Sequence, residues 1–189
     1  MNVQNKNDLR QKYRTKRSSF GEEFIKEASH SACEIIAKSE AFLNADTVLL
    51  YYPIKNEISP IPLIELCLSM GKNVAFPVCQ NEVSTLIFKN ISTMDDLTCA
   101  SFGILEPKPH CKTADITEKT LCLVPALAFS REGHRLGYGK GFYDRFLNDF
   151  EGICAGFSYS LLVCDSLPHD EHDIPLDMIV TESEVMYFA

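Results

Sequence analysis

Hydrophobic residues recur along the chain with two spacings, which predict alternating helices and strands. Residues 22–39 place five apolar side chains on one helical face: Phe24, Ala28, Ala32, Ile35 and Ile36. Residues 47–52 instead form a short apolar run that Pro53 ends, as expected of a buried strand. Further helices are predicted over 8–17, 62–70 and 142–150, and further strands over 73–78, 83–89, 121–125, 153–159, 178–180 and 185–188. This order favours an α/β fold, a single-domain three-layer α/β/α sandwich with a largely parallel central sheet.

Length and composition favour one cytoplasmic domain. The chain has 189 residues, 46% of them hydrophobic, which suits a single core spanning residues 1–189. Its first 17 residues are polar and basic, unlike a signal peptide, and no apolar run approaches bilayer length. The eight cysteines include no Cys-x-x-Cys pair, and Cys67 and Cys122 lie within apolar runs, so we expect buried reduced thiols.

Charge is distributed unevenly between the N-terminus and the rest of the chain. Residues 1–19 contain six Lys and Arg residues against Asp8, a net +5, whereas the remainder has 12 basic and 25 acidic residues, a net −13. A nucleic-acid partner is not expected, because the segment has no aromatic residue besides Tyr13 and the acidic body would repel a polyanion. Lys6 and Arg10 share one helical face and could reach ligand phosphates together, although a solvated basic helix explains the charge equally well.

Residues 131–145 carry the most informative pattern, with four glycines, several cations, aromatic residues and Asp144 just after an apolar run. Glycines at 137, 139 and 141 allow the backbone to approach a ligand closely, and they precede a predicted helix whose free N–H groups attract anions. A Walker motif is excluded because Lys140 is followed by Gly141, and a dinucleotide fingerprint does not fit the spacing. A plain strand-to-helix turn remains the alternative, but it leaves the cations and Asp144 unexplained. The segment therefore predicts a phosphate site.

Three predicted strands end in loops rich in polar and aromatic residues: 52–57, 125–140 and 159–173. Ligands of α/β sheets bind beyond the carboxyl ends of strands, so we expect these loops to converge. A carboxylate beside phosphates is repulsive unless a cation lies between them, so Asp144 is interpreted as a magnesium ligand. Its alternative role, stabilising a helix N-terminus, contributes only about 0.3–1 kcal/mol. His169 and His172 could form a soft-metal site, but a solvated acidic loop is the preferred interpretation.

Five blocks of residues follow one another over nearly the whole chain: Lys6-x-x-x-Arg10, Tyr51-Tyr52-Pro53 with Glu57, Phe102-Gly103-Ile104-x-Glu106-Pro107, Val124-Pro125-x-Leu127-Ala128-Phe129, and Arg135 to Arg145. Together they resemble the 5-formyltetrahydrofolate cyclo-ligase family, also called 5,10-methenyltetrahydrofolate synthetases. Departures from the family pattern are Ala126 for glycine, Ser130 for aspartate and Phe142 for tyrosine. The resemblance implies a cytoplasmic ligase that uses ATP and Mg²⁺. By this resemblance, the formyl oxygen of 5-formyltetrahydrofolate would attack the γ-phosphorus of ATP and release ADP. N10 would then close on the activated carbon and phosphate would depart, which yields 5,10-methenyltetrahydrofolate.

The resemblance also implies roles for individual residues. The ATP site would comprise Lys6, Arg10, Arg135, Gly137, Tyr138, Gly139, Lys140, Gly141 and Tyr143. The folate would contact Tyr52, Glu57, Tyr138 and Phe142, although such aromatic residues often serve the core instead. Asp144 and Asp173 would bind magnesium, and the catalytic residues would be Arg135, Lys140 and Asp144.

The implied partners are small-molecule substrates, with no nucleic acid or membrane, and a monomer is expected. Lys16 and Arg17 are expected to have little effect on ATP affinity. Two other classes stay open: a sugar-phosphate isomerase or CoA-transferase-like enzyme without ATP, and a non-catalytic folate or nucleotide binder. Neither needs a magnesium pair together with a second cationic clamp.

Overall fold

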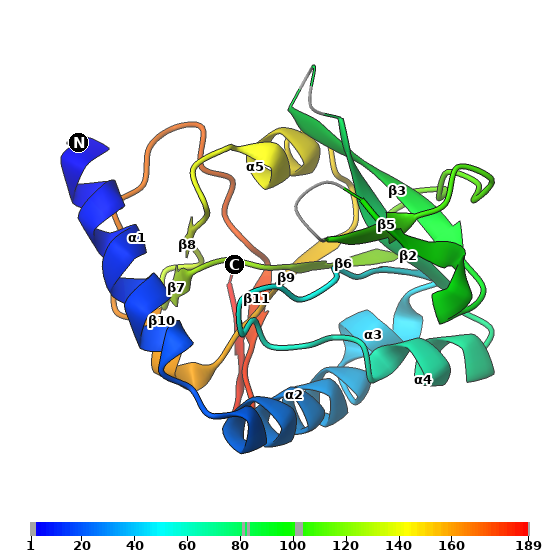
Figure 1. The fold of residues 1–189 in the computed structure, drawn as a ribbon, viewed down its shortest axis with the longest axis horizontal. Coiled ribbons are helices and arrows are strands. Elements are labelled where there is room, and N and C mark those ends of the chain that lie inside the picture. Colours follow the sequence, from blue (N-terminus) through cyan, green and yellow to red (C-terminus); the bar gives the residue numbers. More distant parts are fainter. Residues whose placement is uncertain (1–2, 81, 83, 101–103, 189) are drawn as a thin grey trace.

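The computed structural model describes residues 3–80, 82, 84–100 and 104–188 (Figure 1). Val83, where a strand was predicted to begin, and the motif residues Phe102 and Gly103 lie outside the described residues. The helices are α1 (Val3–Ser18), α2 (Glu22–Ala37), α3 (Glu40–Asn44), α4 (Leu63–Ser69) and α5 (Phe142–Leu147), with the 3-10 helices η1 (Met94–Asp96) and η3 (Ser160–Leu162). The strands are β1 (Thr47–Leu49), β2 (Asn73–Gln80), β3 (Thr85–Ile91), β4 (Leu97–Cys99), β5 (Leu105–Pro107), β6 (Thr120–Val124), β7 (Ala128–Ser130), β8 (Arg135–Leu136), β9 (Ile153–Phe157), β10 (Val163–Cys164), β11 (Met178–Val180) and β12 (Val185–Tyr187).

A seven-stranded sheet in the order β12-β11-β9-β6-β1-β2-β3 forms the centre of the fold. Its five inner strands pair in parallel, and β12 and β3 pair antiparallel at the two edges. Alternate residues of the inner strands belong to two separate hydrophobic clusters, as Val48 and Leu49 show. Helices α2, α3 and α4 cover one face and α5 the other (Figure 1). The predicted three-layer architecture with a largely parallel sheet is confirmed.

The predicted elements agree with the structure in type more often than in length. The helix predicted over 22–39 ends at Ala37, because the Ser39 side chain accepts a hydrogen bond from the Phe42 backbone and begins a separate helix, α3. The helix predicted over 142–150 ends at Leu147. Sequence periodicity missed the small β10-β7-β8 sheet and the β4-β5 hairpin, whose strands have only two or three residues. Such short strands contain too few residues to establish a period.

The cysteines only partly match the expectation from composition. All eight are free thiols, and five are buried, including Cys67 and Cys122 inside the two hydrophobic clusters. Cys99 is exposed, so the expectation of buried thiols is wrong there, because β4 presents it to solvent. Across the part of the chain that the structure describes, no helix combines the length and apolarity needed to cross a membrane.

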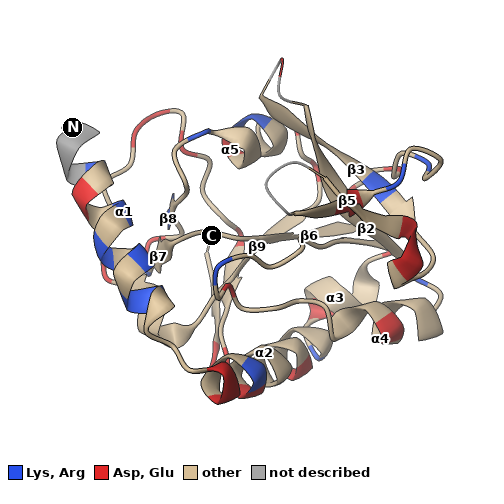
Figure 2. Cartoon of the chain, viewed as in Figure 1, with Lys and Arg blue, Asp and Glu red and all other residues tan. Residues whose placement is uncertain are grey.

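The strand order reverses at β1, because the chain continues to β2 on one side and later returns to β6 on the other. Such a reversal leaves a crevice beyond the carboxyl ends of the strands, where α/β proteins bind ligands. Helix α1, which carries a series of Lys and Arg residues, lies at this end of the molecule beside β7, β8 and β10 (Figures 1 and 2). The fold therefore brings the basic N-terminus to the predicted ligand site.

Candidate active site

The three predicted loops meet through direct contacts. The Tyr138 hydroxyl donates a hydrogen bond to the Glu57 carboxylate, joining the loop after β8 to the loop after β1. Tyr159, after β9, donates through its hydroxyl to the Asn56 carbonyl at 3.1 Å. Arg135 Nη1 donates to the Ile174 carbonyl at 2.6 Å, which joins the glycine segment to the acidic loop. The predicted convergence is confirmed.

Glu57 is the buried anion at the centre of this meeting point. Only 6% of the residue is exposed, and one carboxylate oxygen accepts a hydrogen bond from the Ile54 backbone at 2.9 Å. The other oxygen contacts Tyr138 and lies 3.5 Å from Arg17 Nη1. Burial raises the pKa of Glu57, while Arg17 and the hydrogen bonds from Tyr138 and Ile54 act in the opposite direction.

The loop that carries Glu57 has an uncommon backbone conformation. Lys55 and Asn56 have φ angles of 48° and 62°, in the left-handed region that non-glycine residues seldom adopt. These two residues turn the chain so that Glu57 N donates to the Ile54 carbonyl at 3.0 Å while its side chain binds the Ile54 amide. Local strain of this kind concentrates at functional sites, which supports a binding role for this loop.

A small polar cavity lies between α1 and the carboxyl ends of β6 and β9. It is lined by Arg17, Glu57, Ala126, Ser158 and Tyr159, among others. Its volume of about 10 Å³ suits a single water molecule, whereas pockets for drug-sized ligands usually span about 300–1,000 Å³. The cavity as it stands is therefore too small for a ligand of that size.

The glycine segment lies directly against α1. Gly139 and Gly141 have φ angles of 94° and 68°, so these positions favour glycine, whereas Gly137 does not adopt a positive φ. Arg10 Nε donates to the Gly137 carbonyl at 3.0 Å, and a Cβ added to Gly139 would lie 3.2 Å from Arg10 Cζ. Lys140 is exposed. The structure thus brings together the glycines and one of the two predicted helix cations.

Both predicted metal ligands form ion pairs with predicted phosphate-binding cations. Asp144 pairs with Arg135, whose side chain is only 4% exposed. Asp173 Oδ2 lies 2.7 Å from Lys6 Nζ, which also binds Asp170 at 2.9 Å. Because Arg135 also holds the Ile174 carbonyl, next in sequence to Asp173, both carboxylates belong to one connected group of residues.

The predicted aromatic contacts differ in their surroundings. Tyr138 is part of the Glu57 network, and Tyr52 and Phe142 are partly buried against the two hydrophobic clusters. The Tyr143 hydroxyl is buried, with no hydrogen-bond partner among the residues that the structure describes. A contact of Tyr52 or Phe142 with folate, and of Tyr143 with ATP, stays a prediction.

Sequence reasoning missed Arg17 as a site residue. Arg17 is 2% exposed, and its Nη2 donates to the Tyr138 hydroxyl at 2.7 Å. Its position in a basic helix gave no sign of burial, because neighbouring cations of α1 such as Arg14 and Lys16 are exposed. A tertiary contact more than a hundred residues away in sequence decides its environment.

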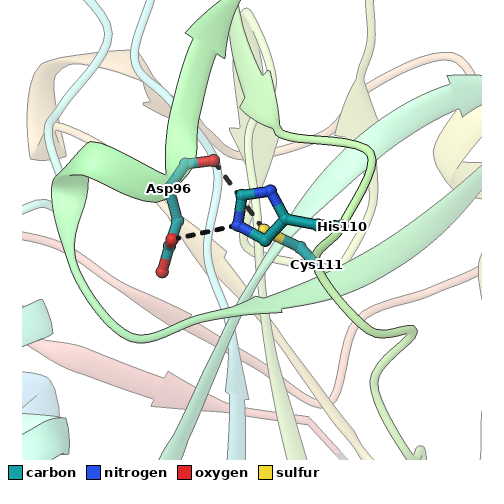
Figure 3. Close-up of side chains that lie close together, drawn as sticks. All are labelled: Asp96, His110 and Cys111. Carbon is teal, nitrogen blue, oxygen red and sulfur yellow. Dashed lines mark hydrogen bonds and ion pairs between the residues drawn. The ribbon is translucent and has the colours of Figure 1, made fainter.

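A second cluster lies away from these loops. Asp96, His110 and Cys111 place ligand-type atoms within 4.8 Å of one another (Figure 3). Asp96 already accepts hydrogen bonds from two backbone amides that cap η1, and Cys111 Sγ contacts the Asp96 carbonyl at 3.8 Å. His110 Nε2 lies 3.5 Å from Asp96 Oδ1, so these side chains already have partners within the chain. We therefore interpret this cluster as structural.

The alternative soft-metal site at His169 and His172 does not form a comparable cluster in the described part of the chain. His169 instead stacks on His134, with ring centroids 3.7 Å apart, and His172 is exposed. The interpretation of this segment as a solvated acidic loop stays a prediction.

Comparisons with known proteins show which family the chain resembles. A family model described as the 5-formyltetrahydrofolate cyclo-ligase family matches residues 2–182. The chain is 32% identical over 146 residues to the 5-formyltetrahydrofolate cyclo-ligase of Escherichia coli (strain K12), covering 75% of this chain and 80% of the relative. It is 27% identical over 199 residues to the probable 5-formyltetrahydrofolate cyclo-ligase of Schizosaccharomyces pombe, covering 96% and 97%.

Solved structures show the same fold. The 5,10-methenyltetrahydrofolate synthetase of Aquifex aeolicus matches with a TM-score of 0.86 and 33% identity, covering 96% of this chain and 92% of that chain. The 5,10-methenyltetrahydrofolate synthetase of Mycoplasma pneumoniae matches with a TM-score of 0.75 and 24% identity, covering 94% and 99%, which supports the fold alone. With four of the five sequence blocks joined by direct contacts and a family model matching almost from end to end, the chain belongs to the 5-formyltetrahydrofolate cyclo-ligase family.

Proposed function

We propose that this protein converts 5-formyltetrahydrofolate to 5,10-methenyltetrahydrofolate with ATP and Mg²⁺, releasing ADP and phosphate. Family membership supports the reaction class. The observation that carries the proposal is that the α1 cations meet both the glycine segment and the acidic loop: Arg10 binds Gly137 at 3.0 Å and Lys6 binds Asp173 at 2.7 Å. We further propose that residues 1–189 form one catalytic domain acting on small-molecule substrates.

The chemistry explains why such a site needs concentrated positive charge. A formyl oxygen is a poor leaving group, and its phosphorylation makes it a good one when N10 attacks the same carbon. Phosphoryl transfer depends chiefly on positioning and on neutralising charge. In our proposal Lys6, Arg10, Arg135 and Lys140 provide that charge, and backbone amides of residues 137–141 bind phosphate oxygens. Helix α5 has only six residues, so we assign its dipole a minor part.

The carboxylates of Asp144 and Asp173 fit magnesium, which prefers oxygen ligands. When bound there, Mg²⁺ would neutralise phosphate charge. In the structure the two carboxylates are already balanced by cations that differ in burial. Arg135 is buried and fixed by a backbone carbonyl, whereas Lys6 is 18% exposed. We therefore expect Lys6 to leave Asp173 and bind phosphate, while Arg135 stays with Asp144.

At the other end of the crevice, Glu57 and Tyr138 are proposed to orient the folate. The Glu57 carboxylate can accept hydrogen bonds from N–H groups of the pterin or from N10, and it is held by the Ile54 amide. Tyr52 and Phe142 would supply apolar surface for the ring system. Fixing N10 opposite the activated carbon is how such contacts would accelerate ring closure.

The experiment is to incubate purified protein with 5-formyltetrahydrofolate and Mg-ATP and follow the absorbance of the methenyl product. We expect product only when folate, nucleotide and divalent metal are all present, with one ADP formed per turnover. Product without nucleotide would exclude the ligase mechanism and favour an enzyme that does not use ATP. Release of AMP would show that adenylation activates the formyl group. Binding of folate without turnover would identify a non-catalytic binder.

A further inference from the structure

The buried guanidinium of Arg17 lies at the end of a helix whose other cations face solvent or the nucleotide side. Its three polar contacts come from three separate loops. Nη2 donates to the Tyr138 hydroxyl at 2.7 Å, Nη1 donates to the Ala126 carbonyl at 3.3 Å, and Nη1 lies 3.5 Å from Glu57 Oε1. The guanidinium also lies over the Tyr138 ring, 5.7 Å from its centroid.

These contacts place Arg17 at the reversal of the strand order. Glu57 follows β1, Ala126 follows β6, and Tyr138 belongs to the glycine segment. Arg17 therefore links the loop after β1 to the loop after β6, and these two loops form the walls of the crevice. A planar guanidinium can bond to several acceptors in fixed directions, which an ammonium group cannot do.

Stability alone gives a weak account of this residue. A buried ion pair loses the hydration of both charges, and apolar residues of similar volume often stabilise a fold as well. The same helix buries Tyr13, at 7% exposure, against the hydrophobic cluster, so apolar contacts are available to dock α1. An apolar residue at position 17 could not fix the orientation of the Glu57 carboxylate and the Tyr138 hydroxyl.

We propose that Arg17 is a positioning residue that holds Glu57 and Tyr138 in the orientation in which they bind the folate. This inference rests on the proposed function. It gives α1 a role at both substrates, because Lys6 and Arg10 near its start face the nucleotide side. The eleven residue steps from Lys6 to Arg17 extend over about 16 Å of helix, which is enough to reach both sides.

The inference predicts selective effects on the folate. In Arg17→Met, which keeps an unbranched apolar side chain, we expect folate affinity and kcat/KM for folate to fall about 10- to 100-fold, the loss expected for charge-assisted hydrogen bonds. Affinity for a non-hydrolysable ATP analogue should change by no more than about twofold. Arg17→Lys should recover part of the loss, because it restores the charge but not the fork of donors. Arg14→Ala is the matched control, since Arg14 is exposed on the same helix.

A double-mutant cycle separates positioning from a general structural effect. Titration calorimetry with 5-formyltetrahydrofolate would be performed on Arg17→Met, Tyr138→Phe and the double variant, with the ATP analogue as a check that each protein is folded. If Arg17 acts through Tyr138 and Glu57, the double variant should lose clearly less affinity than the product of the two single losses. A merely structural residue would give independent losses.

Three results would overturn the inference. They are folate kcat/KM within about twofold of wild type in Arg17→Met, equal loss of folate and nucleotide affinity, and full additivity with Tyr138→Phe. Should Arg17→Met fail to fold, Arg17→Lys carries the same cycle. If the wild-type protein makes no methenyl product, the proposed function fails and the inference fails with it. If the wild type is active and the Arg17 variants bind folate normally, only the inference fails.

Discussion

The Tyr143 hydroxyl is predicted to destabilise the fold, so its removal should stabilise the protein, unlike most substitutions. It is buried, with no hydrogen-bond partner among the described residues, and burial raises its pKa well above the usual range for tyrosine. A buried polar group left unpaired costs about 1–3 kcal/mol. Tyr143→Phe removes that oxygen and keeps the ring against the hydrophobic cluster. We expect the variant to unfold with a free energy about 1 kcal/mol higher than wild type, which raises Tm by about 2–4 °C in a domain of this size.

Tyr51→Phe is the matched control, because it makes the same chemical change at another buried tyrosine. Tyr51 is 3% exposed, and its hydroxyl donates to the Ile58 carbonyl at 2.6 Å. Removing this hydroxyl breaks the bond and leaves a buried carbonyl unpaired, which should cost about 1–3 kcal/mol. The two variants should therefore change stability in opposite directions.

Urea unfolding of wild type and both variants at one pH measures the two differences, provided that the denaturant dependence of the free energy stays the same. Equal destabilisation by Tyr143→Phe and Tyr51→Phe would refute the reasoning and show that the Tyr143 hydroxyl is satisfied by an internal water. A second measurement tests the proposed nucleotide contact. If ATP pairs with this hydroxyl, the rise in Tm on adding an ATP analogue should be smaller in Tyr143→Phe than in wild type.

Three further predictions concern the charged groups of the site. Asp173→Asn should lower kcat strongly, change the free energy of unfolding by no more than about 0.5 kcal/mol, and recover partly at raised Mg²⁺; unchanged kinetics would remove it from the metal site. Lys6→Ala and Arg10→Ala should each weaken ATP binding by about 1.5–3 kcal/mol in calorimetry, while Arg14→Ala should not, and equal effects that salt abolishes would indicate diffuse attraction. Burial raises the folded pKa of Glu57 above its ordinary value of 4.5, so its ionisation should destabilise the fold as pH rises through that folded pKa. In urea unfolding, the free energy of unfolding of wild type should fall relative to that of Glu57→Gln as pH rises from 4.5 through the folded pKa. A difference between the two proteins that stays constant or grows in favour of wild type would contradict this direction.

The central sheet could be predicted well because each of its buried strands contains its own signal. Thr120 to Val124 are all buried, as a continuous apolar run predicts for a strand of a parallel sheet. The meeting of the three loops followed from one topological rule. Individual pairings could not be predicted, since Glu57 and Tyr138 are 81 residues apart and Lys6 and Asp173 are 167 apart. No local pattern encodes contacts over such separations.

The charge of α1 shows how the structure changes the meaning of a sequence pattern. A net +5 over residues 1–19 suggested either phosphate binding or a solvated helix, and the structure adds that several of these cations hold acceptors on the chain itself. The burial of these ion pairs increases from the start of α1 to its end. Near its start, the partners of Lys6 include the exposed Asp170, and such surface pairs contribute little because water competes for them.

Near its end, Arg17 is buried against Glu57 and Tyr138, and separating those charges would leave them unpaired in the interior. In our proposal, helix α1 is therefore anchored at the folate side and exchangeable at the nucleotide side. We expect phosphates to replace the acidic loop as partners of Lys6 at small cost and the Arg17 contacts to persist. This asymmetry requires that substitutions near the start of α1 act on ATP and that substitutions at its end act on the folate, which is the division that the variants at Lys6 and Arg17 measure.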